Sequence, residues 1–97
     1  MTIIFEVIDK TGRKIHLSKE RWSHITTKHT NMSDKLEDLK IALINPLIIV
    51  PHKYDITMRN YYLYYKLHKD YLLVSVKYLN GEGYIATAFV TRKLVKR

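Results

Sequence analysis

Short apolar runs separated by polar turn residues occur at the start of the chain and again from residue 47 onward. Residues 3–8 read IIFEVI, and the turn-forming stretch DKTGRK follows, so residues 3–8 and 14–17 predict a β-hairpin. The run LIIV at 47–50 predicts a short buried strand that Pro51 closes. Three runs rich in Tyr, Leu, Val and Ile predict further strands over 61–69, 71–79 and 84–91. The sequence NGEG between the last two is a strong hairpin turn.

Helical spacing appears in the middle of the chain, beginning after Ser18. The stretch KERWSHITTKH follows this N-cap residue, and Glu20 lies in the first turn, where the helix dipole favours an anion. Trp22 and Ile25 share one face at spacing i, i+3, His24 lies beside them, and His29 falls at or beyond the helix end. These features predict a first helix over residues 19–29.

A second helix is predicted for DKLEDLKIALIN, residues 34–45. Its leucines at 36, 39 and 43 form an apolar stripe, Asn31 or Ser33 is expected to cap it, and Pro46 ends it. The order of elements predicts one α+β domain over residues 1–97, with a basic tail at about 92–97. We expect an N-terminal hairpin and two helices packed on one face of an antiparallel sheet of about four strands, with the other face open.

Period-two alternation assigns side chains to the two faces of this sheet. Leu63, Leu72, Val74, Ala86 and Ala88 are expected on the core side, and Ile85 on the open side. The open face is expected to display Tyr62, Tyr64, Lys66, Ser75, Lys77 and Thr87. Aromatic side chains among lysines suit stacking on unpaired bases and pairing with phosphates. The alternative is a sheet whose lysines guard an edge and whose tyrosines only satisfy β-propensity.

Net charge changes this picture toward a polyanion partner. The chain carries +8, and residues 46–97 hold nine Lys/Arg against three Asp/Glu, whereas residues 1–45 hold eight against six. A basic half in a small domain favours RNA or DNA as the partner, although high charge also serves solubility. Cysteine is absent, which excludes disulfides and fits a reducing cytoplasm. No run approaches the length of a membrane span, so we expect no membrane partner.

The histidines favour proton transfer over metal binding. A helical zinc site needs histidines at i and i+4, whereas His24 and His29 are separated by five positions and have few carboxylates nearby. RNA can be cut without metal or cofactor when a base takes the 2′-OH proton, an acid protonates the leaving 5′-oxygen and cations stabilise the phosphate. Histidine can serve in either role near neutrality. The alternative is that these histidines are only surface or boundary residues.

Several stretches together resemble a known family. They are LSKERWSHITTKH, a leucine helix ending INP, the strand YYLYY, then VSVKYL and YIATAFVT. In this order they are similar to the small phage-type nuclease domains of the barnase–EndoU–colicin–RelE (BECR) superfamily, over about residues 16–91. Such domains carry a proline and an acidic residue after the second histidine, where this chain has Thr30 and Asn31.

The resemblance implies a metal-independent endoribonuclease acting on tRNA or mRNA, such as a toxin or an effector of phage conflict. By position it implies His24, His29 and Thr87 as catalytic residues, and it places Arg59 and the strand tyrosines where phosphate contacts are expected. Arg21, Lys28 and Lys77 are the other basic residues that we expect to contact phosphate. Tyr62, Tyr64, Lys66 and Ser75 complete the expected RNA surface. A small acidic antitoxin or inhibitor is the expected protein partner. Two alternatives stay open: a non-catalytic RNA-binding or inhibitory module on the same fold, and a basic domain that binds an acidic protein.

Overall fold

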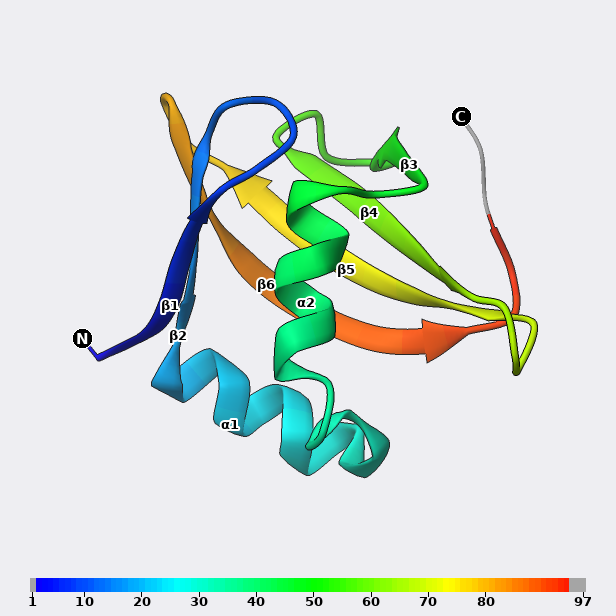
Figure 1. Ribbon diagram of the computed structural model, residues 1–97. Helices are drawn as coiled ribbons and strands as arrows, with labels where there is room; N and C mark the ends of the chain where they lie inside the picture. Colours follow the sequence, from blue (N-terminus) through cyan, green and yellow to red (C-terminus); the bar gives the residue numbers. More distant parts are fainter. Residues whose placement is uncertain (1, 95–97) are drawn as a thin grey trace.

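The computed structural model describes residues 2–94 and contains a single sheet with two α-helices (Figure 1). The order along the chain is β1 (Ile3–Ile8), β2 (Lys14–Ser18), α1 (Lys19–Lys28), a 3₁₀ turn η1 (Thr30–Met32), α2 (Leu36–Ile44), β3 (Ile48–Pro51), β4 (Met58–Tyr65), β5 (Asp70–Tyr78) and β6 (Glu82–Thr91). Every helix and strand expected from the sequence is present, so the α+β class is confirmed.

The sheet has six strands in the order β1-β2-β6-β5-β4-β3. Neighbours are antiparallel except β2 and β6, which run parallel with Lys14 opposite Glu82 and His16 opposite Tyr84. The expectation of about four antiparallel strands was therefore wrong, because the N-terminal hairpin joins the same sheet through β2. Gly83 permits this close pairing, since a Cβ there would lie 2.7 Å from the backbone oxygen of Lys77 and 2.8 Å from Ile15 Cδ1.

The main core lies between α2 and the sheet. Leu39, Ala42 and Leu43 of α2 are fully buried against strand residues that include Tyr61 and Val74. Figure 1 shows α2 crossing in front of the strands, while α1 lies at one end of the sheet, below β6. Ile25 of α1 is also buried in this core, and this contact holds α1 against the margin of the sheet.

The start of α2 differs from expectation. Lys35 is its N-cap residue and makes no side-chain capping bond, whereas residues 30–32 form the 3₁₀ turn. Asn31 and Ser33 therefore do not cap α2. Met32 is fully buried, and its insertion into the core fixes the chain between the two helices in place of a cap.

Face assignments from period-two alternation hold for β4 and β5 and fail in part for β6. Leu63, Leu72 and Val74 lie with the core as expected. In β6 the register shifts between Ser75, which faces Thr87, and Val76, which faces Ile85, so Ala86 is an extra residue in a β-bulge. Ile85 is consequently buried in the core rather than exposed on the open face.

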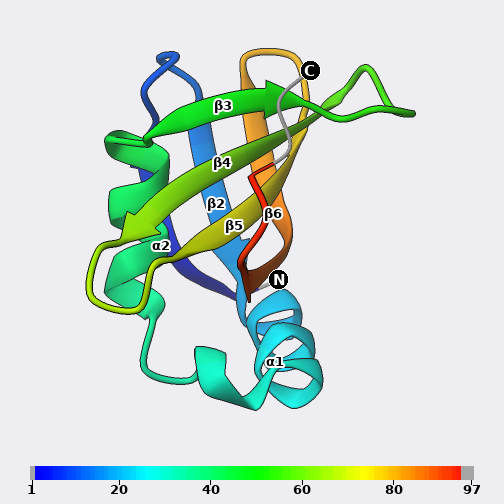
Figure 2. The same ribbon diagram turned by 90° about the vertical axis from the view of Figure 1, so that its right-hand side faces the viewer.

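The second face is less open than the sequence predicted. Figure 2 shows the chain after β6 running back across this face, and Leu94 packs there against a buried cluster of Val50, Tyr62 and Leu73. Tyr62 is 1% exposed and Ser75 is 6% exposed, so the expectation that both side chains are displayed to solvent was wrong. Of the expected basic tail, residues 95–97 lie outside the described range.

Two residues expected on the strand over 61–69 lie instead in the turn after β4. The strand ends at Tyr65, and residues 66–69 form a turn in which Lys69 has a φ of 55° and donates its N–H to Tyr65 O at 2.8 Å. Lys66 and His68 therefore lie in the turn and not on a strand face. Within residues 2–94, no helix is long and apolar enough to cross a membrane.

Candidate active site between α1 and β6

One face of α1 carries the cationic side chains of the candidate site. The helix is capped by Ser18, whose hydroxyl accepts a hydrogen bond from the Arg21 N–H at 3.1 Å. Arg21, His24 and Lys28 follow at positions i, i+3 and i+7, which align on one side of an α-helix. All three are exposed, whereas Ile25, which lies next to them on the helix surface at i+4 from Arg21, is buried against the sheet.

The bulge in β6 forms the opposite wall. Ala86 and Thr87 line a cleft of about 550 Å³ together with Arg21, Ser23, His24, Ile25, Thr27 and Lys28 of α1. Because Ala86 is the extra residue of the bulge, the strand turns Thr87 toward α1 beside its register partner Ser75. The structure thus brings Arg21, His24, Lys28 and Thr87 into one cleft.

His29 is the C-cap residue of α1 and does not line the cleft. Its half-buried ring packs on Phe89 with 5.5 Å between ring centroids and 31° between planes. His29 is five positions after His24, which is about 7.5 Å along a helix axis. Phe89 is two positions after Thr87, which is roughly 7 Å along a strand. The two histidines are therefore spaced along α1 much as Thr87 and Phe89 are spaced along β6, with His29 outside the lining of the cleft itself.

The chemistry of this cleft is that of an anion site with a proton-transfer group. A guanidinium and an ammonium supply positive charge, the Thr87 hydroxyl can donate or accept a hydrogen bond, and imidazole can transfer a proton. Ser23 and Thr27 add two hydroxyls that the sequence reading missed, although their spacing on the same helix was a usable signal. The lining residues of the cleft include no carboxylate. Such a set suits a phosphodiester.

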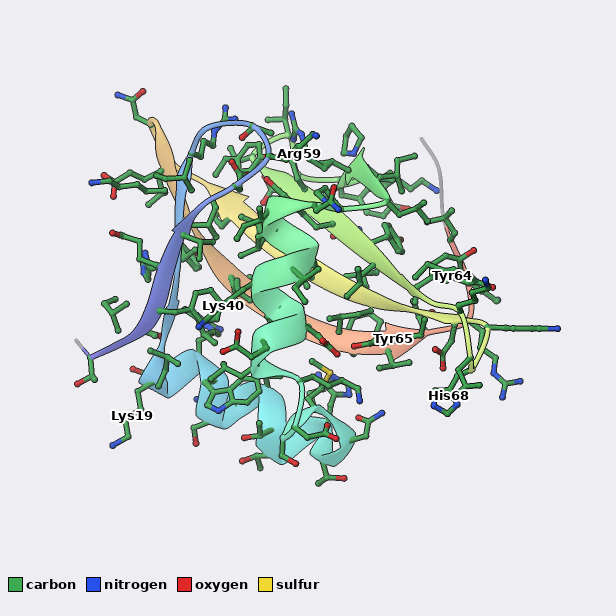
Figure 3. The ribbon with its side chains drawn as sticks, in the orientation of Figure 1. Lys19, Lys40, Arg59, Tyr64, Tyr65 and His68 are labelled. Atoms are coloured by element: carbon green, nitrogen blue, oxygen red, sulfur yellow. The ribbon has the colours of Figure 1, made fainter. Side chains whose placement is uncertain are left out.

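Arg59, by contrast, lies at the far end of the sheet. Figure 3 shows it near the upper end of the sheet, away from α1. Its guanidinium donates to Ile56 O at 2.6 Å and to Met58 O at 2.9 Å, and it stacks on the ring of Tyr78 at 5.2 Å. Arg59 is therefore remote from His24 and is occupied by its own loop.

Lys77 is also engaged elsewhere. Its ammonium pairs with the Asp55 carboxylate at 3.2 Å. Hydrogen bonds from the hydroxyl and the N–H of Thr57, followed by the bond from Lys77, hold the pKa of Asp55 at about 2. Asp55 therefore stays ionised at neutral pH and neutralises the lysine that the sequence placed on the phosphate.

The expected tyrosine surface does not adjoin the cleft. Tyr64 is 42% exposed, and its ring packs against Tyr71 with 5.2 Å between centroids. Figure 3 places Tyr64 and His68 at the opposite end of the molecule from Lys19, the first residue of α1. Lys66 belongs to the turn beside them. The helix, rather than these strand residues, supplies the charge of the candidate site.

Comparisons with protein-family models, with curated proteins and with solved structures found no match for this chain. In the part of the chain from Thr2 to Leu94, no three His, Cys, Asp or Glu side chains are grouped so that they could hold a metal ion. We therefore infer the function of the chain from the geometry of the cleft.

Proposed function

We propose that the cleft between α1 and β6 binds RNA and cleaves it by metal-independent acid–base transesterification. The observation that carries this proposal is the convergence of Arg21, His24 and Lys28 on Thr87 in a cleft whose lining has no carboxylate. The proposal also agrees with the resemblance of the sequence to the barnase–EndoU–colicin–RelE superfamily. The biological role that follows is that of a toxin or an effector of phage conflict.

In this mechanism the scissile phosphate lies over Thr87, between Arg21 and Lys28. His24 and His29 take the two proton-transfer roles, one removing the 2′-OH proton and the other protonating the 5′-oxygen as the P–O5′ bond breaks. The O2′ atom forms the new bond to phosphorus, so the products are a 2′,3′-cyclic phosphate and a 5′-hydroxyl end. Arg21 and Lys28 stabilise the charge that develops on the non-bridging oxygens.

The test is cleavage of purified RNA in the presence of EDTA, with the ends of the products mapped. His24→Ala should lower the cleavage rate on the order of 10²- to 10⁴-fold, as loss of a general acid or base does. His68→Ala is the matched control, because His68 is an exposed histidine in the turn at the other end of the sheet. Equal cleavage by the two variants would refute the role of His24 and point to a contaminating nuclease.

A second candidate function is a non-catalytic RNA-binding module. The packing of His29 on Phe89 favours it, since a half-buried ring with an aromatic neighbour also fits a structural role. In that case the folded wild type binds RNA, with affinity that falls steeply with salt, and leaves it uncut. A flat salt dependence would instead favour an acidic protein, such as an antitoxin or inhibitor, as the partner of the cleft.

A further inference from the structure

A second cleft adjoins the candidate active site and shares Arg21 with it. It has a volume of about 340 Å³ and is lined by His16, Ser18, Glu20, Arg21, Leu79 and Tyr84. These residues come from β2, the start of α1 and the β5–β6 hairpin, which meet only because β2 pairs with β6. Arg21 is the one residue that lines both clefts.

The floor of this second cleft is aromatic. His16 and Tyr84 are register partners on β2 and β6, and their ring centroids lie 6.1 Å apart with 38° between planes. Tyr84 faces away from the core, because its neighbours Gly83 and Ile85 are the buried residues of this part of β6. Leu79, which is 50% exposed, adds an apolar wall.

The fold makes little use of these rings. Among residues 2–94, neither His16 nor Tyr84 belongs to the two buried apolar clusters. Both are half-buried, so one side of the pair remains accessible. A cross-strand aromatic pair can be a simple surface feature. The shared arginine and the adjoining phosphate-type cleft favour a ligand that has a flat ring and a negative charge close together.

We propose that His16 and Tyr84 form a stacking subsite for one base of single-stranded RNA, whose adjacent phosphate is held by Arg21. This subsite deepens the proposed function and depends on it for the identity of the ligand. Thr87 and Tyr84 belong to the same strand, so a nucleotide chain that passes Thr87 reaches the aromatic pair next. Stacking tolerates every base, and the subsite therefore supplies affinity and register with little sequence preference.

Binding is measured by fluorescence anisotropy with a labelled pentanucleotide of 2′-O-methyl RNA, which lacks the 2′-OH nucleophile. Tyr84→Ala should weaken binding about 10- to 100-fold, and Tyr84→Phe should bind like the wild type, because a base stacks on either ring. The slope of affinity against salt should stay unchanged in Tyr84→Ala, whereas Arg21→Gln should lower it by about one. Tyr64→Ala, at the other end of the sheet, is the matched control and should bind normally.

An abasic version of the probe locates the contact. Moving one abasic position along the pentanucleotide should find a position at which wild type and Tyr84→Ala bind equally. A Tyr84→Ala variant that folds and binds every probe like the wild type overturns the subsite, as does an equal loss in Tyr64→Ala. Competition by pentaglutamate as strong as that by RNA also overturns it and assigns the cleft to an acidic protein.

These outcomes separate the subsite from the proposed catalysis. If the wild type cleaves RNA and Tyr84→Ala cleaves and binds it equally well, the catalytic proposal stands and the subsite falls. If the 2′-O-methyl probe binds as described but cleavable RNA stays intact, the subsite stands and the catalytic proposal falls.

Discussion

Tyr61→Phe tests the network that ties the N-terminal hairpin to the centre of the sheet. Asp9 is 5% exposed, and its Oδ1 accepts hydrogen bonds from the Thr11 N–H, the Thr11 hydroxyl and the Arg13 N–H. The other oxygen, Oδ2, accepts from the hydroxyl of Tyr61, which also lies 2.7 Å from the hydroxyl of Tyr78. Removing one oxygen atom therefore deprives a buried carboxylate oxygen of its tyrosine donor.

The expected loss follows from the kind of bond removed. A hydrogen bond to a charged group contributes about 1.5–3 kcal/mol, and the ring of Tyr61 stays in place in the phenylalanine variant. We therefore expect a loss of about 2 kcal/mol in the free energy of unfolding. In a domain of this size each kcal/mol lowers Tm by about 4–8 °C, so the melting temperature should fall by roughly 10 °C.

Urea unfolding followed by circular dichroism measures the free energy, and a thermal scan measures Tm. Tyr64→Phe is the control, because Tyr64 is an exposed tyrosine of the same strand, and its stability should stay within about 0.5 kcal/mol of the wild type. If Tyr61→Phe is as stable as this control, the Asp9 network does not contribute as described.

The difference in stability between the wild type and Tyr61→Phe should also depend on pH. Burial, followed by the bonds to Asp9 and Tyr78, raises the pKa of Tyr61 well above its usual value of 10. The unfolded chain ionises this hydroxyl above pH 10 while the folded chain keeps it protonated, so its contribution is complete below pH 10 and declines above it. The difference in stability between wild type and Tyr61→Phe should therefore shrink as pH rises beyond 10.

Two further predictions concern the sheet and the acid range. Gly83→Ala should lower the free energy of unfolding by about 1–3 kcal/mol, because the added methyl group would lie less than 3.0 Å from Lys77 O and Ile15 Cδ1. Urea unfolding measures this loss, and a variant as stable as the wild type would contradict the close pairing of β2 with β6. The pKa of Asp55, about 2 against an ordinary 3.8, predicts a contribution that is complete above about pH 4 and is lost as pH falls toward 2. Asp55→Asn should flatten the acid limb of stability against pH between these values, and an unchanged limb would count against the Thr57 and Lys77 bonds.

Local patterns predicted the elements well because their causes are local. Ser18 caps α1 through residues next to it in the sequence. Asn80 and Gly81 form a two-residue turn in which Gly81 has a φ of +75°, so this turn also depends on adjacent residues alone. The pairing of β2 with β6 joins residues 14–16 to residues 82–84 and leaves no local signal. The bulge at Ala86 is likewise visible only from its partner strand, which is why Ile85 was assigned to the wrong face.

The candidate site divides in the same way. Arg21, His24 and Lys28 come from one short helix and were expected at the site from the sequence, and the resemblance supplied Thr87. Alternation along strands could not reveal that Leu94 covers part of the second face, because the contact between Leu94 and the cluster containing Tyr62 joins residues far apart in the sequence. His16 and Tyr84 were missed for the reason that applies to β2 and β6, since only the parallel pairing makes them neighbours.

The position of β6 between β2 and β5 has a consequence for how the molecule assembles. The N-terminal hairpin and α1 are synthesised before their partner strand β6, and more than sixty residues separate β2 from β6, so this long loop must close before they dock. Contacts of such large sequence separation slow folding. A nascent chain in which β6 has not yet been made thus has one wall of each cleft, and activity at this surface can begin only after β6 has been synthesised.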